Sequence, residues 1–246
     1  TMPSIFSYQS AEVDWCEGNF ERSAVIAEYY NTVTTVSTTV HVLPSRAPQA
    51  SRALLTELPL LPAGLFSTYF HMTLSYVGQL LDELSILWTL AVAYSFWLPK
   101  TYFPRCIKSR YDPEGHCVAG SEGRVGTMTS MVAILRSIAL AVSCRCNDKR
   151  VHRMAAVMVL WWVLAISSWI SDRWLCGLWQ ALSFPYLHSF WHVLIAISLL
   201  YCFPLVIYFD VRNEMPSFKP KLGYWPSDSW PIVVPYINME EPLKQC

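Results

Sequence analysis

The chain contains 246 residues with a formal net charge of zero at pH 7, and 53% of its residues are hydrophobic against 15% charged. Soluble domains carry about 25% charged residues, so this composition indicates a protein that lies largely within a membrane. A neutral chain supplies no basic field for nucleic acid, and the sequence has no nucleic-acid-binding motif, so nucleic acid is excluded as a partner. The first residues lack a charged stretch followed by an apolar one, and we expect no cleavable signal peptide.

The first half of the chain contains three apolar stretches in which we expect membrane-crossing helices. Residues 24–43 are rich in Thr and form a weak candidate, whereas residues 60–81 form a somewhat amphipathic one. Residues 83–98 form a clear candidate, because they are close to the length that a helix needs to cross the hydrocarbon core. Two further clear candidates follow at residues 154–170 and 186–209.

Basic residues orient these spans. Lys and Arg cluster after 83–98, before 154–170 and after 186–209. Because positive flanks favour the cytosolic side, we expect these ends in the cytosol, the N-terminus in the lumen and residues 210–246 in a cytosolic tail. The starts of 83–98 and 186–209 and the end of 154–170 then share the luminal side.

The segment between residues 104 and 150 is atypical. Residues 104–126 carry too many charges to cross a membrane, and residues 127–144 are only moderately apolar and contain Arg136. Since the flanking spans both have cytosolic ends here, either no crossing or two crossings must lie between them, and the sequence offers at most one. The expected fold is an all-α, polytopic membrane helix bundle with about five clear spans.

Three histidines lie inside the most apolar parts of the chain. His71 is in FSTYFHMTLSYVGQLLDEL, and His188 and His192 are in FPYLHSFWHVLIAISLLY. Imidazoles in such sequence are costly without partners, and residues four apart share one face of a helix. A third imidazole from another segment gives three nitrogen ligands and leaves one zinc position open, which is the arrangement of catalytic zinc. We interpret the other histidines as bystanders: His41, His116 and His152.

Asp82 lies at the expected luminal start of 83–98. In one continuous helix it would be roughly 16 Å from His71, too far for one metal site. We therefore expect a helix hairpin, with a turn around residues 75–78 that brings Asp82 to His71. Ser67 lies four residues before His71 and points from the same face. Taken alone, Asp82 would equally suit a carboxylate facing a helix dipole, as would Glu83.

The eight cysteines include no CxxC pair. We interpret Cys144 and Cys146, a CxC, as chance thiols rather than metal ligands. Cys16 and Cys176 adjoin polar, Trp-rich segments that suit one oxidising face of a membrane, where a disulfide would persist. The acidic residues of DWCEGNFERSAVIAE do not match an EF-hand loop, and their spacing alone indicates a solvated, acidic entry to a helix.

The segment FHMTLSYVGQLLDEL resembles the alkaline ceramidases, a family of membrane hydrolases with seven helices. The resemblance extends to EVDWCEGNF with AEYYNT, to SSWISDRWLC, to YLHSFWHVL and to the tail EMPSFKPKLGYWPSDSWPIVVPYI. Residues 33–63 and 104–150 do not resemble the family, whose counterparts there are apolar helices. We therefore expect one transmembrane ceramidase-like domain over residues 1–246 with an incomplete seven-helix plan, and we hypothesise an altered splice form or an erroneous gene model.

The resemblance also implies roles for particular residues. In the family, Asp82 would hold the zinc-bound water and shuttle its proton, and Ser67 would help to hold the tetrahedral oxyanion. Cys16 and Cys176 would form a disulfide. The metal ligands that the resemblance implies are His71, His188 and His192 for zinc, and Asp14, the Trp15 carbonyl, Glu17, Asn19 and Glu28 for calcium.

The histidine pattern and the resemblance together predict zinc-dependent hydrolysis of the N-acyl amide bond of ceramide, giving sphingosine and a fatty acid. Ceramide would enter from the surrounding membrane lipid. The alternative is a non-catalytic lipid-binding membrane protein, or an inactive isoform that lacks complete helices. We expect an integral membrane protein of the endoplasmic reticulum, with the Golgi as the alternative; no pattern specifies an oligomeric state or a preferred acyl chain length.

Overall fold

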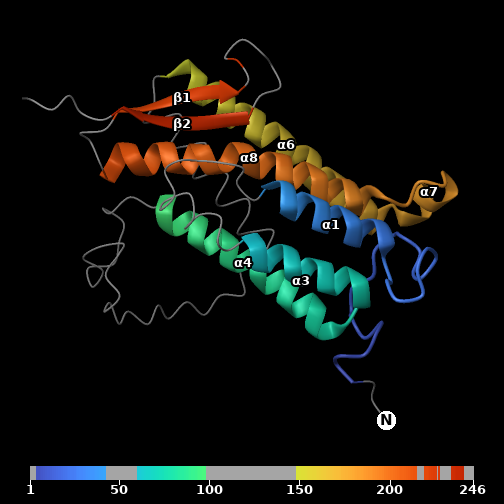
Figure 1. The fold of residues 1–246 in the computed structure, drawn as a ribbon. Helices are drawn as coiled ribbons and strands as arrows, with labels where there is room; N and C mark the ends of the chain where they lie inside the picture. Colours follow the sequence, from blue (N-terminus) through green and yellow to red (C-terminus); the bar gives the residue numbers. More distant parts are fainter. Residues whose placement is uncertain are drawn as a thin grey trace, which may run out of the picture. The chain divides into compact units, whose positions relative to one another are not determined.

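The structure, a computed structural model, describes residues 4–42, 60–97, 148–214, 219–225, 227 and 234–240. The expectations for 44–59 and for 104–147 therefore lie outside the described residues. Figure 1 shows the helices and strands of the described ranges. Their bounds are α1 Tyr29–Val42, α3 Leu60–Thr73, α4 Tyr76–Trp97, α6 Lys149–Trp174, α7 Cys176–Ala181, α8 Leu187–Glu214, β1 Lys219–Trp225 and β2 Val234–Glu240.

The chain divides into two compact units. The first contains Thr1–Thr89 and Ala156–Cys202, and the second contains Leu90–Ala155 and Phe203–Cys246. Every residue that the sequence analysis assigned to a zinc, calcium or catalytic role belongs to the first unit. The site can therefore be described within that unit alone.

The expected break between His71 and Asp82 is present, at residues 74 and 75. Leu74 follows α3 with a φ of 48°, the left-handed conformation that commonly ends a helix. The Ser75 hydroxyl accepts the backbone N–H of Gly78 at 3.1 Å, so it caps α4. Because of this cap, α4 already begins at Tyr76, within the stretch expected to be a turn. The hairpin prediction is thus confirmed, with a tighter connection than expected.

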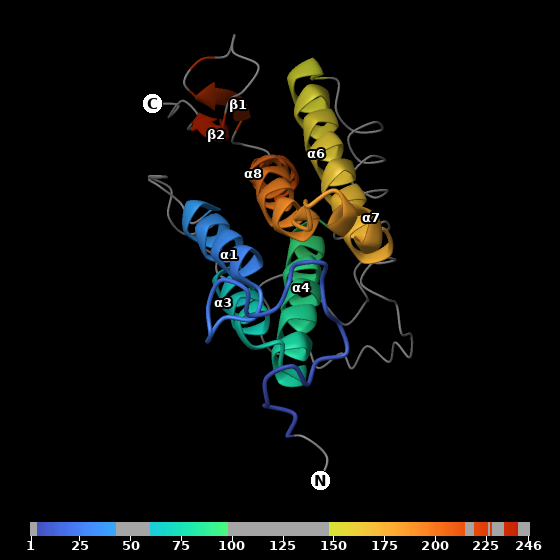
Figure 2. The ribbon, with the colours of Figure 1, turned by 90° about the vertical axis from the view of Figure 1, so that its right-hand side faces the viewer.

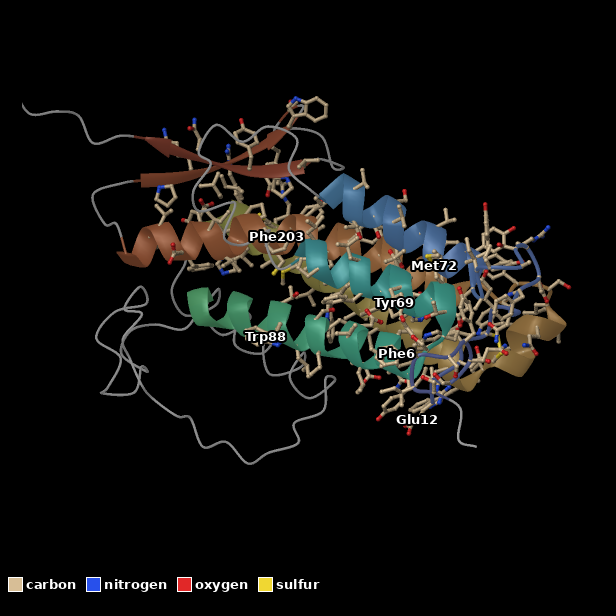
Figure 3. The ribbon with its side chains drawn as sticks, turned by 60° about the horizontal axis from the view of Figure 1, so that its bottom comes forward. Phe6, Glu12, Tyr69, Met72, Trp88 and Phe203 are labelled. Atoms are coloured by element: carbon tan, nitrogen blue, oxygen red, sulfur yellow. A yellow bond between two sulfur atoms is a disulfide. The ribbon has the colours of Figure 1, made fainter. Side chains whose placement is uncertain are left out.

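The N-terminal segment of residues 4–28 closes the end of α3. The last carbonyl groups of a helix have no partner within it and need donors from elsewhere. Here the backbone N–H groups of the segment supply them, and Figure 3 shows Phe6 and Glu12 of this segment at the ends of α3 and α4 that meet in the turn. The bonds run from Glu28 to His71 (3.0 Å), Ala27 to Met72 (2.9 Å), Gln9 to Thr73 (3.1 Å) and Ala11 to Leu74 (2.9 Å).

Helices α1 and α3 lie side by side in both ribbon views (Figures 1 and 2). Their close approach depends on Gly64, where an added Cβ would overlap the Thr39 side chain. The Thr hydroxyls of α1 donate to carbonyl groups one turn earlier, as Thr35 does to Asn31 at 2.8 Å. This pairing within the helix explains how a Thr-rich stretch forms a packed helix, although it begins at Tyr29 rather than at residue 24.

Two helices of the described residues are long and apolar enough to cross a membrane. They are Lys149–Trp174 and Leu187–Arg212, which contain the expected spans 154–170 and 186–209. In contrast, α1 and α3 have 14 residues each, short of the roughly 20 that a crossing needs. Among the residues described, the protein is mostly helical with two candidate spans, and the five expected spans are not confirmed.

The tail contains a β-hairpin, so the all-α expectation is wrong there. Strands β1 and β2 pair antiparallel, with Lys219 opposite Glu240 and Trp225 opposite Val234. In β1, buried Leu222 and Tyr224 alternate with more exposed neighbours, the two-residue period of a strand. Within the second unit, the Tyr224 hydroxyl lies 3.4 Å from the Arg150 carbonyl oxygen of α6, so the hairpin packs on the start of that helix.

Candidate metal centre

The three histidines of the apolar segments converge. His71 comes from the last turn of α3, and His188 and His192 come from the first two turns of α8. Their potential ligand nitrogens all lie within 4.8 Å of one another, and His71 Nε2 is 3.1 Å from His192 Nε2. All three side chains are buried. The expected meeting of His71 with the pair on α8 is therefore present.

The outer nitrogen of His71 faces a buried carboxylate. His71 Nδ1 lies 2.5 Å from Glu28 Oε2, and both side chains are fully buried. A carboxylate beside Nδ1 favours the tautomer with the proton on Nδ1, which leaves the Nε2 lone pair facing the other histidines. The Glu28–His71 contact depends on the capping of α3, because the Glu28 backbone N–H donates to the His71 carbonyl.

Glu28 is held in turn by two further donors. Its Oε1 accepts the Trp15 backbone N–H at 3.1 Å, and its Oε2 accepts the Asn31 side-chain amide at 3.0 Å. Asn31 accepts the Ser189 hydroxyl at 2.6 Å, so a chain of hydrogen bonds runs from α8 through Asn31 and Glu28 to His71. Sequence reasoning missed Asn31 and Ser189, because nothing local distinguishes them from other polar helix residues.

The first histidine of α8 is surrounded differently. The Trp15 ring stacks on the His188 ring, with centroids 3.6 Å apart and planes 18° from parallel. The His188 backbone N–H donates to Asp172 Oδ1 at 3.2 Å. His188 Nδ1 is buried and has no hydrogen-bond partner among the described residues. An imidazole nitrogen with no protein partner, next to two other imidazoles, is what a metal ligand requires.

Asp172 is a third residue that sequence reasoning missed. It is buried at 1% exposure, and its Oδ2 accepts the Cys16 backbone N–H at 3.0 Å. The signal available was an acidic residue at the end of an apolar span, in SSWISDRWLC, where ionisable side chains are often functional.

A disulfide joins the N-terminal segment to the start of α7. Cys16 and Cys176 are bonded, with Cα atoms 5.3 Å apart and a sequence separation of 160 residues. The pairing that the family resemblance implied is therefore confirmed in the structure. It places the acidic N-terminal segment next to the end of α6.

Asp82 and Ser67 meet across the helix hairpin. Ser67, one turn before His71 on α3, faces the Asp82 carboxylate on α4. Ser67 is buried and Asp82 is partly buried. Among the described residues, the cluster of possible metal ligands within 4.8 Å contains the three histidines and not Asp82. The hairpin thus brings Asp82 to Ser67, and Asp82 is not part of the histidine cluster.

The five residues expected to bind calcium all lie in the N-terminal segment. Glu17 accepts the backbone N–H groups of Tyr30 (2.6 Å) and Asn31 (2.9 Å) and so caps α1. The Asn19 amide nitrogen donates to both Asp14 oxygens, at 3.2 and 3.0 Å. The carbonyl oxygen of the same Asn19 amide is buried without a partner among the described residues.

Burial changes the acidity of these carboxyl groups. It raises the pKa of Glu17 to about 6 and that of Glu28 to about 7. For Asp14, burial and the charge of Glu28 both raise the pKa. Since Glu17 and Glu28 are buried at 5% and 0% exposure, the interpretation from spacing alone, a solvated acidic entry to a helix, is wrong for these two residues.

The chain is similar to known proteins over its whole length. The sequence model of the Ceramidase family matches residues 7–113 and 124–238. Alkaline ceramidase 1 of Mus musculus is 41% identical over 100% of this chain and 97% of its own length. Alkaline ceramidase 1 of Homo sapiens is 40% identical over 100% of both chains, and alkaline ceramidase of Drosophila melanogaster is 34% identical over 96% of this chain and 90% of its own length.

The extent of this match corrects one expectation. Residues 33–63 were expected to lie outside the resemblance, but the family match runs through all of them. Of the second segment, 104–150, it leaves only 114–123 unmatched.

Proposed function

The chain belongs to the alkaline ceramidase family, and from this we propose that it hydrolyses the N-acyl amide bond of ceramide to sphingosine and a fatty acid, with zinc held by His71, His188 and His192. The observation that carries the proposal is the convergence of three buried imidazoles, with nitrogens within 4.8 Å, from helices far apart in sequence. Such a cluster has no structural purpose that apolar side chains would not serve better.

The spacing of His71 and His192 fits a zinc ion, and His188 places its ligand atom within 4.8 Å of both. Nitrogen ligands of tetrahedral zinc lie about 2.0–2.1 Å from the metal and so about 3.3–3.4 Å from one another. The 3.1 Å between His71 Nε2 and His192 Nε2 is close to this value. The unpartnered Nδ1 of His188 and the carboxylate beside His71 Nδ1 complete the fit. A zinc ion bound there would lower the pKa of a water molecule to about 7 and polarise the amide carbonyl.

The protein's own groups handle the protons of the reaction. Asp82 takes a proton from the attacking water while the water oxygen bonds to the amide carbon. Asp82 then returns this proton to the amine nitrogen as the C–N bond breaks. Ser67, which faces Asp82, would hold the carboxylate in place. For Ser67 to bind the oxyanion as well, its hydroxyl would turn from Asp82 toward the substrate oxygen.

We also propose that Asp14, the Trp15 carbonyl, Glu17, Asn19 and Glu28 bind calcium. Oxygen ligands that include several carboxylates suit this ion. Two observations support the site. The Asn19 carbonyl oxygen is buried without a partner among the described residues, and the buried carboxyl groups of Glu17 and Glu28, both with raised pKa values, are close enough for the charge of Glu28 to raise the pKa of Glu17. A cation between them would relieve this repulsion. Because Glu28 also contacts His71, calcium would stabilise the carboxylate that orients a zinc ligand.

The proposed setting is a single domain over residues 1–246 in the membrane of the endoplasmic reticulum, with ceramide supplied by the bilayer. The Cys16–Cys176 disulfide supports a luminal position for the N-terminal segment, since disulfides persist on the oxidising side. Residues 210–246 would then form a cytosolic tail that contains the β-hairpin.

The test is ceramide hydrolysis by the purified full chain in detergent, with zinc content measured in parallel. His188→Ala is expected to lose both activity and bound zinc. The matched control is His152→Ala, because His152 is an exposed α6 histidine whose Nδ1 lies 2.9 Å from the Asp148 carbonyl oxygen. Full activity in His188→Ala would refute the assignment. Bound zinc without turnover in the wild-type protein would favour the non-catalytic, lipid-binding alternative.

A further inference from the structure

Helix α8 lacks a capping residue of its own. The residues before Leu187 are Phe184, Pro185 and Tyr186, none of which has the short polar side chain that caps a helix start. Asp172 of α6 supplies the cap instead. Asp172 Oδ1 accepts the His188 backbone N–H at 3.2 Å. The first turn of α8 is thus satisfied by a carboxylate from another helix.

The other oxygen of Asp172 binds a different part of the chain. Asp172 Oδ2 accepts the backbone N–H of Cys16 at 3.0 Å, and Cys16 is disulfide-bonded to Cys176, four residues beyond Asp172. One buried carboxylate therefore joins the N-terminal segment, the end of α6 and the start of α8. Hydrogen bonds to an ionised acceptor are shorter and roughly twice as strong as neutral ones.

Asp172 holds the backbone of Cys16 and of His188, and both residues lie at the stack of the Trp15 and His188 rings. His188 is one member of the stack, and Trp15, the other member, directly precedes Cys16. The Trp15 ring can press on the imidazole only while the two backbones keep their spacing. Asp172 sets that spacing, because its two oxygens bind one backbone each.

We propose that Asp172 is the positioning residue of His188: by holding the His188 backbone and, through Cys16, the Trp15 ring, it keeps the imidazole turned toward His71 and His192. The inference rests on the proposed function, in which His188 is a metal ligand. Asp172 does not act as a ligand itself, since the cluster of possible ligands within 4.8 Å contains only the three histidines among the described residues.

The test compares Asp172→Asn with Asp148→Asn in the purified full chain. Asparagine keeps the shape of aspartate but turns one acceptor oxygen into an NH₂ group, which faces an N–H donor. Asp148 is the matched control, because its Oδ1 caps the start of α6 by accepting the Arg150 backbone N–H at 2.8 Å, and it contacts none of the three histidines. The measured quantities are zinc affinity, by competition with a chelator, and the visible absorption spectrum of the protein loaded with Co²⁺.

We expect Asp172→Asn to bind zinc about 10–100-fold more weakly, as is typical when a residue that orients a ligand is lost, and to show an altered Co²⁺ spectrum. Asp148→Asn should keep both properties. A purely structural role for Asp172 would reduce the yield or Tm but leave the affinity and spectrum of the folded protein unchanged, and that result would overturn the inference.

Two further results are decisive. If Asp172→Asn does not fold, Asp172→Glu replaces it, since it keeps the charge but shifts the carboxylate by one methylene; weaker zinc binding supports the inference, and unchanged binding overturns it. If the wild-type protein binds no zinc or Co²⁺, the proposed function fails and this inference fails with it. Metal binding by the wild type beside an unaffected Asp172 variant overturns the inference alone.

Discussion

The two halves of the histidine cluster are held in different ways. On α3, the His71 ring is fixed by its own nitrogen, which faces the buried Glu28 carboxylate at 2.5 Å. On α8, the His188 ring has no such hydrogen bond among the described residues, and it is fixed by the stacked Trp15 and by its backbone. Electrostatics therefore determines which ring nitrogen of His71 carries the proton, whereas packing determines the orientation of the His188 ring.

The two halves should therefore lose metal binding in different ways when their supports are removed. A hydrogen bond to a carboxylate selects one tautomer, so its loss changes which nitrogen is free to bind a metal. A stacked ring holds the imidazole in one orientation. Its loss lets the imidazole adopt a wider range of orientations without changing any protonation state. Both halves depend on the N-terminal segment, which supplies Glu28 at its end and Trp15 near its middle.

Removing the disulfide should have the largest effect, because it releases the segment on which both halves depend. The paired change Cys16→Ser/Cys176→Ser opens a loop closed across 160 residues, and native disulfides typically contribute about 2–5 kcal/mol. For a chain of this size we expect Tm to fall by roughly 5–15 °C in a thermal unfolding experiment. The control is Cys202→Ser, a free cysteine, and an equal loss in both variants would contradict the prediction.

Glu28→Gln should break the electrostatic half. The glutamine amide would donate to His71 Nδ1 and thereby favour the tautomer whose Nε2 carries the proton, which cannot bind a metal. We expect zinc affinity to fall about 10–100-fold, measured by chelator competition. Glu21→Gln, a change of the same kind at an exposed position of the same segment, should bind zinc as the wild type does. Wild-type affinity in Glu28→Gln would show that the carboxylate does not set the tautomer.

Calcium binding by the carboxyl groups of the N-terminal segment should depend on pH. Because burial raises the pKa of Glu17 to about 6 and that of Glu28 to about 7, protons compete with calcium at mildly acid pH. Raised carboxyl pKa values mean that protonation stabilises the calcium-free fold, so calcium affinity should rise with pH through this range. We expect at least about tenfold tighter binding at pH 7.5 than at pH 5.5, measured by calorimetry. A flat profile would argue against these ligands.

Trp15→Leu should have the smallest effect, because it removes a ring stack but no charge. Aromatic stacking contributes about 0.5–1.5 kcal/mol beyond burial, so zinc affinity should fall by about tenfold at most. Trp174→Leu is the control, since Trp174 is 79% exposed. If Trp15→Leu weakened zinc binding more than Glu28→Gln, packing rather than electrostatics would dominate the site.

Much of the site follows from the sequence because its signals are local. The pair His188 and His192 lies one turn apart on a helix, and an imidazole in apolar sequence needs a partner wherever the chain folds. The hairpin between His71 and Asp82 followed from a length argument, and the structure has it. The alternation of buried and more exposed residues in 219–225 is also a local signal. It lies among prolines, however, and the tail hairpin was not predicted.

The sequence by itself determined which imidazoles belong together and that a break must follow α3, because both depend on spacing along a helix. Only the tertiary structure decided how those imidazoles are held. Asp172 binds Cys16 from 156 residues away, Ser189 binds Asn31 from 158 residues away, and Glu28 reaches His71 across 43. Hydrogen bonds of this kind leave no periodicity in the chain, since they depend on where separate segments meet and not on the order of residues within either.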